Sequence, residues 1–258
     1  FSVNYIVPTI GLEGTPVILK GNIHQTPSSD IFCAFGNVIV IANMLEKNTV
    51  QCIAPPAHTA GAVSIELIAD GISIAPHSPK NFTYIDSSLQ YIYPKLGSVF
   101  GGTQVVVTIG TETAKNITHC KFGQHISTAF TSPNINDDQV ICASPRASIP
   151  GTVIFKVSTN GIDYWPENVY FRYFSQPRVE RIRPSSGPAE TGGTMVTLQG
   201  LYFLDSPDLM CRFGKVGGVN GIWISNEAII CEAPEMYPGD HEVEVSINGI
   251  DFISFIGT

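Results

Sequence analysis

Short runs of apolar and β-branched residues, separated by turn-forming residues, cover most of the chain. Residues 104–109 follow a Gly-Gly-Thr triplet, and residues 194–198 begin with the threonine of another. Residues 242–247 alternate between polar and aliphatic side chains, and two of the polar ones are acidic. A period of two is that of a strand with one buried face, and Val, Ile, Thr, Tyr and Phe favour strands. No stretch shows the spacing of a long amphipathic helix. The pattern therefore predicts an all-β protein.

Turn signals separate the predicted strands. Residues 151–158 run into Asn160-Gly161, and residues 242–247 run into Asn248-Gly249. Asn and Gly tolerate the positive φ that both central residues of a type I′ turn require, so each pair is predicted to be a hairpin turn. Two aromatic triplets, residues 82–84 and 171–173, are predicted to be the last strands of their units.

The pattern repeats three times. Four landmarks recur in the same order: a Pro-x-x-Gly, a Cys-x-Phe-Gly, a Cys-x-x-Pro and a closing turn dipeptide. They begin at Pro8, Cys33, Cys52 and Asp70, then at Pro94, Cys120, Cys142 and Asn160, then at Pro184, Cys211, Cys231 and Asn248. The repeat predicts three immunoglobulin-like β-sandwiches at residues 1–86, 87–175 and 176–258. The connectors hold only a few free residues, so we expect an elongated array with modest flexibility.

The six cysteines fall as one pair in each repeat. The members are 19, 22 and 20 residues apart: Cys33 with Cys52, Cys120 with Cys142, and Cys211 with Cys231. Pairing within modules is the simplest disulfide framework, and it requires an oxidising compartment. Six buried free thiols are the alternative. A metal site is disfavoured, because no Cys-x-x-Cys spacing occurs and two cysteines alone do not complete a zinc site.

Two glycosylation sequons agree with a secreted protein. Asn81 and Asn116 each stand two residues before a threonine. If Phe82 and Tyr84 point into the core, the period of a strand places Asn81 outside. Both residues are therefore candidates for N-linked glycans, with ordinary surface asparagines as the alternative.

Composition excludes some classes of partner. Charged residues make up 14% of the chain and the net charge is −8. The predicted modules carry net charges of −3, +1 and −6, and one small basic group, Arg178, Arg181 and Arg183, is interrupted by Glu180. Nucleic-acid binding needs a concentrated positive surface, so we expect no nucleic-acid partner. No run of 18 apolar residues occurs, so we expect no membrane insertion by this segment.

Enzyme chemistry is not indicated. The histidines are scattered, no catalytic or phosphate-binding motif is present, and we expect no cofactor. The acidic residues near His241, at positions 240–244, are a weak calcium candidate and are better explained as a solvated strand edge. The aromatic side chains of Tyr164, Trp165 and Trp223 are expected to pack within or between modules rather than to anchor a ligand.

The landmarks together resemble the IPT/TIG domain. The third repeat matches best, with Pro184, Gly187, the triplet at residues 192–194, Cys211 and Cys231. The second repeat lacks the aromatic residue after its glycine, and the first replaces Gly-Gly-Thr by residues 13–15, Glu-Gly-Thr. Such modules occur in stalks of plexin-type receptors, in Rel-type transcription factors and beside starch-degrading enzymes, so the resemblance implies the fold rather than one function.

Tandem copies, cysteine pairs and sequons favour a non-catalytic extracellular or cell-surface array. Two versions remain open: a stalk of a receptor or adhesion protein, and the repeating unit of a glycoprotein fibre that joins end to end or laterally. Phe1 and Thr258 both lie near hydrophobic runs, as expected of a segment of a longer chain or repeat. The alternatives are an accessory binding module of a secreted enzyme and a nuclear DNA-binding protein.

Overall fold

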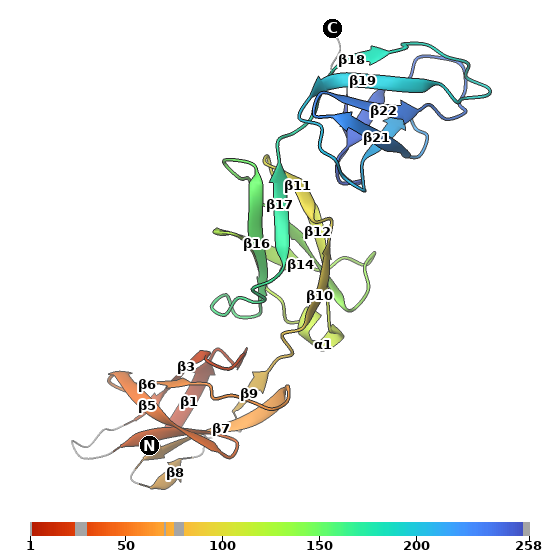
Figure 1. Cartoon of the computed structure of the whole chain (residues 1–258). Helices are drawn as coiled ribbons and strands as arrows, with labels where there is room; N and C mark the ends of the chain where they lie inside the picture. The colour runs from red at the N-terminus through yellow and green to blue at the C-terminus, as the bar shows by residue number, and fades with distance from the viewer. Residues whose placement is uncertain (1, 24–29, 70, 75–79, 255–258) are drawn as a thin grey trace.

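Three β-sandwiches follow one another along the chain (Figure 1). The computed structural model describes residues 2–23, 30–69, 71–74 and 80–254. We name the sandwiches by their strands: β1–β9 form the first module, β10–β17 the second and β18–β24 the third. The one helix of the described residues is α1 (Thr111–Ala114). The predictions of an all-β fold and of an elongated tandem array are confirmed.

The strands are short. Those of the first module are β1 (Ser2–Val7), β2 (Ile10–Gly11), β3 (Pro16–Asn22), β4 (Ile31–Phe35), β5 (Val38–Glu46), β6 (Thr49–Ile53), β7 (Gly61–Ala69), β8 (Ile72–Ile74) and β9 (Asn81–Tyr84). Those of the second are β10 (Leu89–Tyr93), β11 (Leu96–Ser98), β12 (Gln104–Ile109), β13 (His119–Phe122), β14 (His125–Phe130), β15 (Gln139–Ala143), β16 (Gly151–Ser158) and β17 (Tyr170–Phe174). Those of the third are β18 (Arg178–Arg183), β19 (Met195–Leu201), β20 (Met210–Phe213), β21 (Val219–Ser225), β22 (Ala228–Glu232), β23 (Val243–Ser246) and β24 (Ile253–Ser254).

Strand order is the same in the first two modules. The paths are β1-β3-β6-β5-β4-β7-β9-β2 and β10-β12-β15-β14-β13-β16-β17-β11, and β8 also pairs with β7. Only the pairs β2/β9 and β11/β17 are parallel in the described residues. The first half of β5 pairs with β4 and its second half with β6, so this strand crosses from one layer to the other. β14 does the same between β13 and β15.

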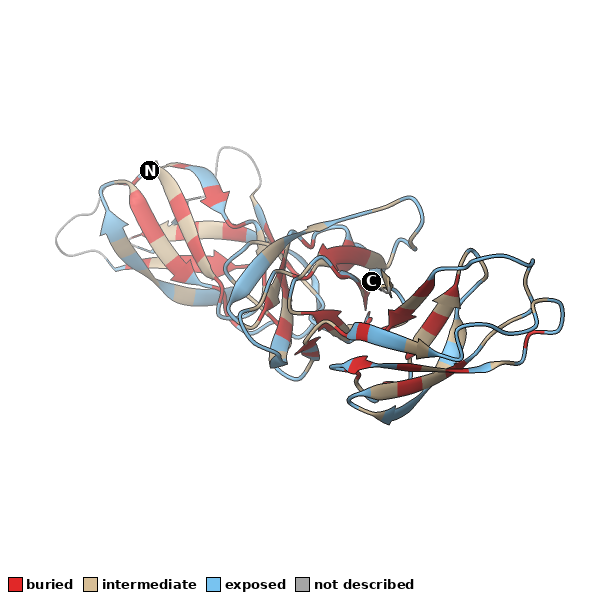
Figure 2. Cartoon of the chain, turned by 90° about the horizontal axis from the view of Figure 1, so that it is seen from above, coloured by how far each residue is buried: buried red, intermediate tan, exposed pale blue. Residues whose placement is uncertain are grey.

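Each module has its own hydrophobic core between the two layers. Buried and exposed positions alternate along the strands (Figure 2), as the period of two predicts. On β9, Phe82 and Tyr84 are buried while Asn81 is exposed, as expected from the sequence. Trp165 is also buried in the second core, which confirms its predicted packing role, whereas Trp223 is 39% exposed on β21.

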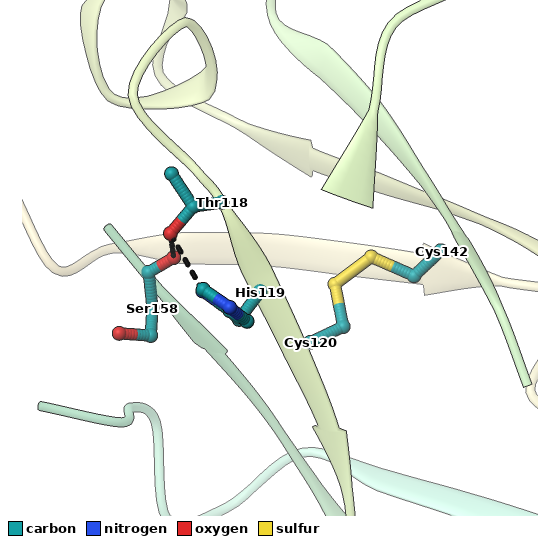
Figure 3. Close-up of a disulfide and its surroundings, with 5 residues drawn as sticks. All are labelled: Thr118, His119, Cys120, Cys142 and Ser158. Atoms are coloured by element: carbon teal, nitrogen blue, oxygen red, sulfur yellow. Dashed lines mark hydrogen bonds between the residues drawn. A yellow bond between two sulfur atoms is a disulfide. The ribbon is translucent and has the colours of Figure 1, made fainter. Parts of the chain in front are cut away.

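A disulfide joins the two layers of every module. The pairs are Cys33–Cys52, Cys120–Cys142 and Cys211–Cys231. Figure 3 shows the second pair, which links β13 to β15 beside Thr118, His119 and Ser158. Cys120 lies opposite Ser127 and Cys142 opposite Ala129, two residues further along β14. β13 and β15 are the two strands that β14 pairs with before and after it changes layers, and the disulfide joins them at that point.

The predicted type I′ hairpins at the Asn-Gly pairs are wrong. Gly161 and Gly249 have φ of 74° and 75°, but Asn160 and Asn248 are not among the described residues with positive φ. Each asparagine instead uses its side chain: Asn160 Oδ1 accepts hydrogen bonds from the backbone N–H groups of Ile162 and Asp163. The amide side chain thus forms the turn and points at a neighbour. Asp70, the equivalent residue of the first module, lies outside the described residues.

We predict that the Cys120→Ala/Cys142→Ala variant lowers the free energy of unfolding of the second module by about 3 kcal/mol, because the closed loop no longer restricts the unfolded chain. Trp165 and Trp223 are the only tryptophans of the sequence, so Trp165 fluorescence in a Trp223→Phe background reports this module in urea titrations. The matched control, Cys33→Ala/Cys52→Ala, should leave that transition within about 0.5 kcal/mol, because the sites are far apart. Equal losses of the free energy of unfolding of the second module in both variants would show that the modules do not unfold independently.

Candidate functional site

A recurring set of polar contacts lies between the modules of this molecule. Among the described residues, no group of three or more His, Cys, Asp or Glu side chains is placed to hold a metal ion. No helix in the described part of the chain is long and apolar enough to cross a membrane. By contrast, one set of side-chain hydrogen bonds occurs at both module junctions, and we call these two sets the first and the second joint.

The first joint connects the turn after β16 to β2 and to the loop between β2 and β3. Thr15 Oγ1 lies 2.5 Å from Asp163 Oδ2. Asn160 Nδ2 donates to the carbonyl of Ile10 at 3.1 Å and to Asp163 Oδ2 at 2.8 Å. The second module therefore presents an amide donor and a carboxylate acceptor to a carbonyl and a hydroxyl of the first.

The second joint repeats this arrangement one module further along. Thr103 Oγ1 donates to Asp251 Oδ2 at 2.6 Å. Asn248 Nδ2 donates to the carbonyl of Leu96 at 3.0 Å and to Asp251 Oδ2 at 2.9 Å. The threonine and the aspartate are 148 residues apart in both joints, so the two joints are equivalent in the repeat.

A glycine in each module brings the joint threonine into position. A Cβ atom at Gly11 would lie 2.4 Å from Thr15 Oγ1, and one at Gly97 would lie 2.7 Å from Thr103 Oγ1. Any other residue would displace the hydroxyl, which explains why the Pro-x-x-Gly landmark ends in glycine. The same pair exists in the third module, where a Cβ at Gly187 would lie 2.3 Å from Thr194 Oγ1.

Apolar side chains support the joints. Leu12 and Ile85 of the first module pack against the core of the second. Leu96 packs against the core of the third, and Phe174, which ends β17, belongs to that core. Burial of this surface excludes water from the neighbouring hydrogen bonds, which strengthens them.

Tyr93 shows the electrostatic effect of the second joint. Its hydroxyl faces Gly249 of the third module, where an added Cβ would lie 3.4 Å from the oxygen. Burial, and secondarily the negative charge of Asp208 in the third module, raise the pKa of Tyr93. Both effects keep the phenol neutral, so this contact carries no charge repulsion in neutral solution.

The sequence-predicted site residues lie away from the joints. The six cysteines are in the cores, and the sequon residues Asn81 and Asn116 are exposed on different modules. In the acidic stretch at residues 240–244, Glu244 pairs with Arg212 at 2.6 Å, and this hydrogen bond lowers the pKa of Glu244. The ion pair with Arg212 therefore explains the presence of Glu244 at this strand edge without a bound metal ion.

Sequence reasoning missed the joint residues. The Asn-Gly-Ile-Asp motif occurs at residues 160–163 and 248–251, and it was interpretable as a turn without any partner. The feature that indicated a partner was the aspartate at the end of the motif, Asp163 or Asp251, which a hairpin turn does not need. A recurring Thr after the Gly-rich landmark, at Thr15, Thr103 and Thr194, was the other half of the pair.

Tandem sandwiches that each contain an internal disulfide define an extracellular interaction module, located outside the cell or on its surface. In the comparison with known families, residues 177–258 match the family model described as the IPT/TIG domain. The match confirms the resemblance that the motifs predicted, and the third module is an IPT/TIG domain.

Curated relatives are much longer proteins. The chain is 26% identical to mouse (Mus musculus) fibrocystin-L over 184 residues, which cover 71% of the chain and 4% of the relative. It is 27% identical to human (Homo sapiens) plexin-A2 over 173 residues, which cover 62% of the chain and 8% of the relative. The chain thus spans less than a tenth of either relative. Among solved structures, the full extracellular region of plexin A4 aligns over 100% of this chain and 24% of its own, with 14% identity and a TM-score of 0.46.

We predict that Thr103→Val weakens the second joint, because the variant keeps the side-chain volume and removes the hydroxyl that binds Asp251. Hydrogen bonds to charged groups contribute about 1.5–3 kcal/mol. In a double-mutant cycle with Asp251→Asn, carried out in a Trp165→Phe background, urea titration followed by Trp223 fluorescence should give a coupling energy of about 1–2 kcal/mol.

Thr194→Val is the matched control for this experiment. Its position in the repeat is the same, but no hydrogen bond engages the Thr194 hydroxyl among the described residues. This variant should show no coupling with Asp251→Asn. A coupling energy near zero for Thr103 would mean that the second joint contributes nothing to the docking of the modules.

Proposed function

We propose that the chain is a non-catalytic spacer segment in the stalk of a larger extracellular or cell-surface protein. The observation that carries this proposal is the identical joint between successive modules. A spacer has to fix the direction of one module relative to the next, and a repeated set of directional hydrogen bonds does so at every step. Function then depends on distance and orientation rather than on a reactive site.

The burial of Asn248 supports a fixed joint. Its side chain is 0% exposed. Its Oδ1 accepts from Ser246 Oγ and from the N–H groups of Ile250 and Asp251, and its Nδ2 donates to Leu96 and Asp251. Pulling the modules apart would leave a buried carbonyl and amide to be resolvated, which opposes bending.

The length of the relatives favours a stalk over a fibre of separate molecules. The aligned segment covers 4% of fibrocystin-L and 8% of plexin-A2, so similar segments stand within very long chains. The third module also keeps the glycine-threonine pair of the joint, at Gly187 and Thr194. That pair suits an array in which each module is able to receive a following one.

Lateral protein partners are part of the proposal. The crossing strand of each module exposes large apolar side chains: Ile39 and Ile41 on β5, Ile126 on β14, and Ile222 and Trp223 on β21. Their exposed fractions lie between 39% and 72%. Exposed apolar groups on the crossing strands of successive modules favour contact with another protein along the array.

We predict that negative-stain images of the purified chain show short three-lobed rods with a narrow distribution of end-to-end lengths. The Asn160→Ala/Asn248→Ala variant should broaden that distribution, because both joints lose their amide donors. The matched control is Asn116→Ala, which removes an exposed asparagine of the second module.

Two outcomes would overturn this proposal. An equally broad distribution for the unmodified chain and the double variant would remove the basis for a spacer. Filaments formed by the purified chain would support the fibre in place of the stalk.

N-linked glycans are the other proposed feature of the stalk. Asn81 is exposed at the start of β9, and Asn116 is exposed after α1, where Nδ2 donates to the Glu112 carbonyl at 2.7 Å. An amide nitrogen that carries a glycan keeps one hydrogen, so this contact is compatible with modification.

We predict that chain secreted from a eukaryotic host loses mass on treatment with a peptide N-glycosidase, because both sequon asparagines are accessible. Asn81→Gln and Asn116→Gln should each remove one part of the mass difference, and the double variant all of it. Intact-mass spectrometry gives the result. An unchanged mass for the unmodified chain would refute glycosylation at both sites.

A further inference from the structure

Tyr237, in the loop between β22 and β23, points away from the core of its module. It is 89% exposed, the largest exposed fraction of any large apolar or aromatic residue in the described part of the chain. A tyrosine ring ordinarily buries most of its apolar area in a core or an interface. Packing within the module therefore does not account for this side chain.

The backbone on both sides of Tyr237 is held in place. The Met236 N–H donates to the carbonyl of Ala189 at 2.9 Å, and the Met236 side chain packs against the third core. The carbonyl of Tyr237 accepts a hydrogen bond from His241 Nε2 at 2.8 Å. Pro238 follows and restricts the backbone further. The loop thus presents the phenol to solvent from a fixed backbone.

Negative charge surrounds this phenol. Four acidic residues lie within five positions of Tyr237, and all are exposed: Glu232, Glu235, Asp240 and Glu242. No Lys or Arg occurs in residues 232–242. Among the ion pairs of the described residues, none includes any of these four acids. The loop therefore offers an accessible hydroxyl among carboxylates that no salt bridge neutralises.

The other tyrosines lack this combination. Tyr170 and Tyr202 are 54% and 57% exposed, and each has one acidic residue within five positions. Tyr164 has two, but it is half-buried and its ring centroid lies 5.3 Å from the ammonium of Lys121. No other tyrosine of the sequence has more than one. High exposure and high negative charge thus coincide at Tyr237.

The equivalent loops show that this place is accessible in a closed and docked module. In the second module Ile149 precedes Pro150-Gly151, as Tyr237 precedes Pro238-Gly239. Ile149 is 75% exposed, although β17 closes that module and the third module is joined to it. Thr59, at the same place in the first module, is also exposed. Exposure is therefore a property of this loop in the repeat.

We propose that Tyr237 is a sulfation site, at which a sulfotransferase of the secretory pathway converts the phenol to a sulfate monoester. The co-substrate is a nucleotide that carries a sulfuryl group in a phosphate–sulfate anhydride. The phenol oxygen forms a bond to sulfur, the bond from sulfur to the bridging oxygen of the anhydride breaks, and the nucleotide leaves as a phosphate. A basic side chain of the transferase takes the phenolic proton, and no atom is oxidised or reduced.

Charge and compartment both favour this reaction. A transferase that binds an anionic donor has a positively charged cleft, which attracts a tyrosine flanked by acidic residues on both sides. The three disulfides place the chain in the oxidising secretory pathway, where it meets such an enzyme. The product adds a further negative charge to a module whose net charge is −6.

The test uses the 258-residue chain secreted from cultured animal cells and treated with a peptide N-glycosidase. A co-secreted reference protein with a sulfated tyrosine shows that the cells carry out the reaction. We expect intact-mass spectrometry to show a species heavier by one sulfate group, and chlorate in the medium, which blocks synthesis of the donor, should remove it. Tyr237→Phe should abolish this species, whereas the matched controls Tyr170→Phe and Tyr202→Phe should retain it.

A second pair of variants tests selection by charge. Glu235→Gln/Asp240→Asn keeps the acceptor tyrosine and should lower the modified fraction about tenfold, because the attraction to the transferase is weakened. The matched control, Asp205→Asn/Glu227→Gln, removes two exposed acids elsewhere in the same module and should leave the fraction unchanged.

Three results would overturn the sulfation site. They are absence of the heavier species while the reference protein is sulfated, its persistence in Tyr237→Phe, and its removal by alkaline phosphatase, which would identify a phosphate ester. Equal modified fractions in the two charge variants would refute selection by the acidic residues around Tyr237.

Discussion

The exchange of one strand between the two layers is the constraint on which each module depends. β5 and β14 leave one neighbour and join the other within a few residues, so the sheet folds back on itself at that point. In all three modules the cysteines lie opposite residues two apart on the crossing strand: Val40 and Ala42, Ser127 and Ala129, Val219 and Gly221. The disulfide holds this bend closed, which a sandwich of about 85 residues with a small core needs.

A closed bend also determines where the ends of the strands lie, and the joints are built from those ends. Strand β2 or β11 offers a carbonyl and the loop after it a threonine hydroxyl, and the turn after β16 or β23 offers an amide and a carboxylate. None of these four groups is reactive, and all are polar groups that a module on its own would expose to water. Because these groups pair across each junction, the local geometry of a sandwich determines the orientation of the next module in the array.

The repeat made most of the fold predictable, because strand runs such as residues 104–109 and 151–158 coincide with β12 and β16. The joints were not predictable, since Asn160 and Asp163 are close in sequence while Ile10 and Thr15 are about 150 residues away. An Asn-Gly pair has an intrinsic turn preference, and the preference alone indicated a hairpin. Tertiary contacts instead selected a conformation in which the asparagine side chain both forms the turn and binds a neighbour.

Closure of a module and docking of the next are coupled through one strand. In the second module, β17 hydrogen-bonds along β11, and the carbonyl of Leu96 on β11 accepts from Asn248. The closing strand thus orders the acceptor of the joint. The strand that closes the second module therefore also positions the backbone group to which the third module docks.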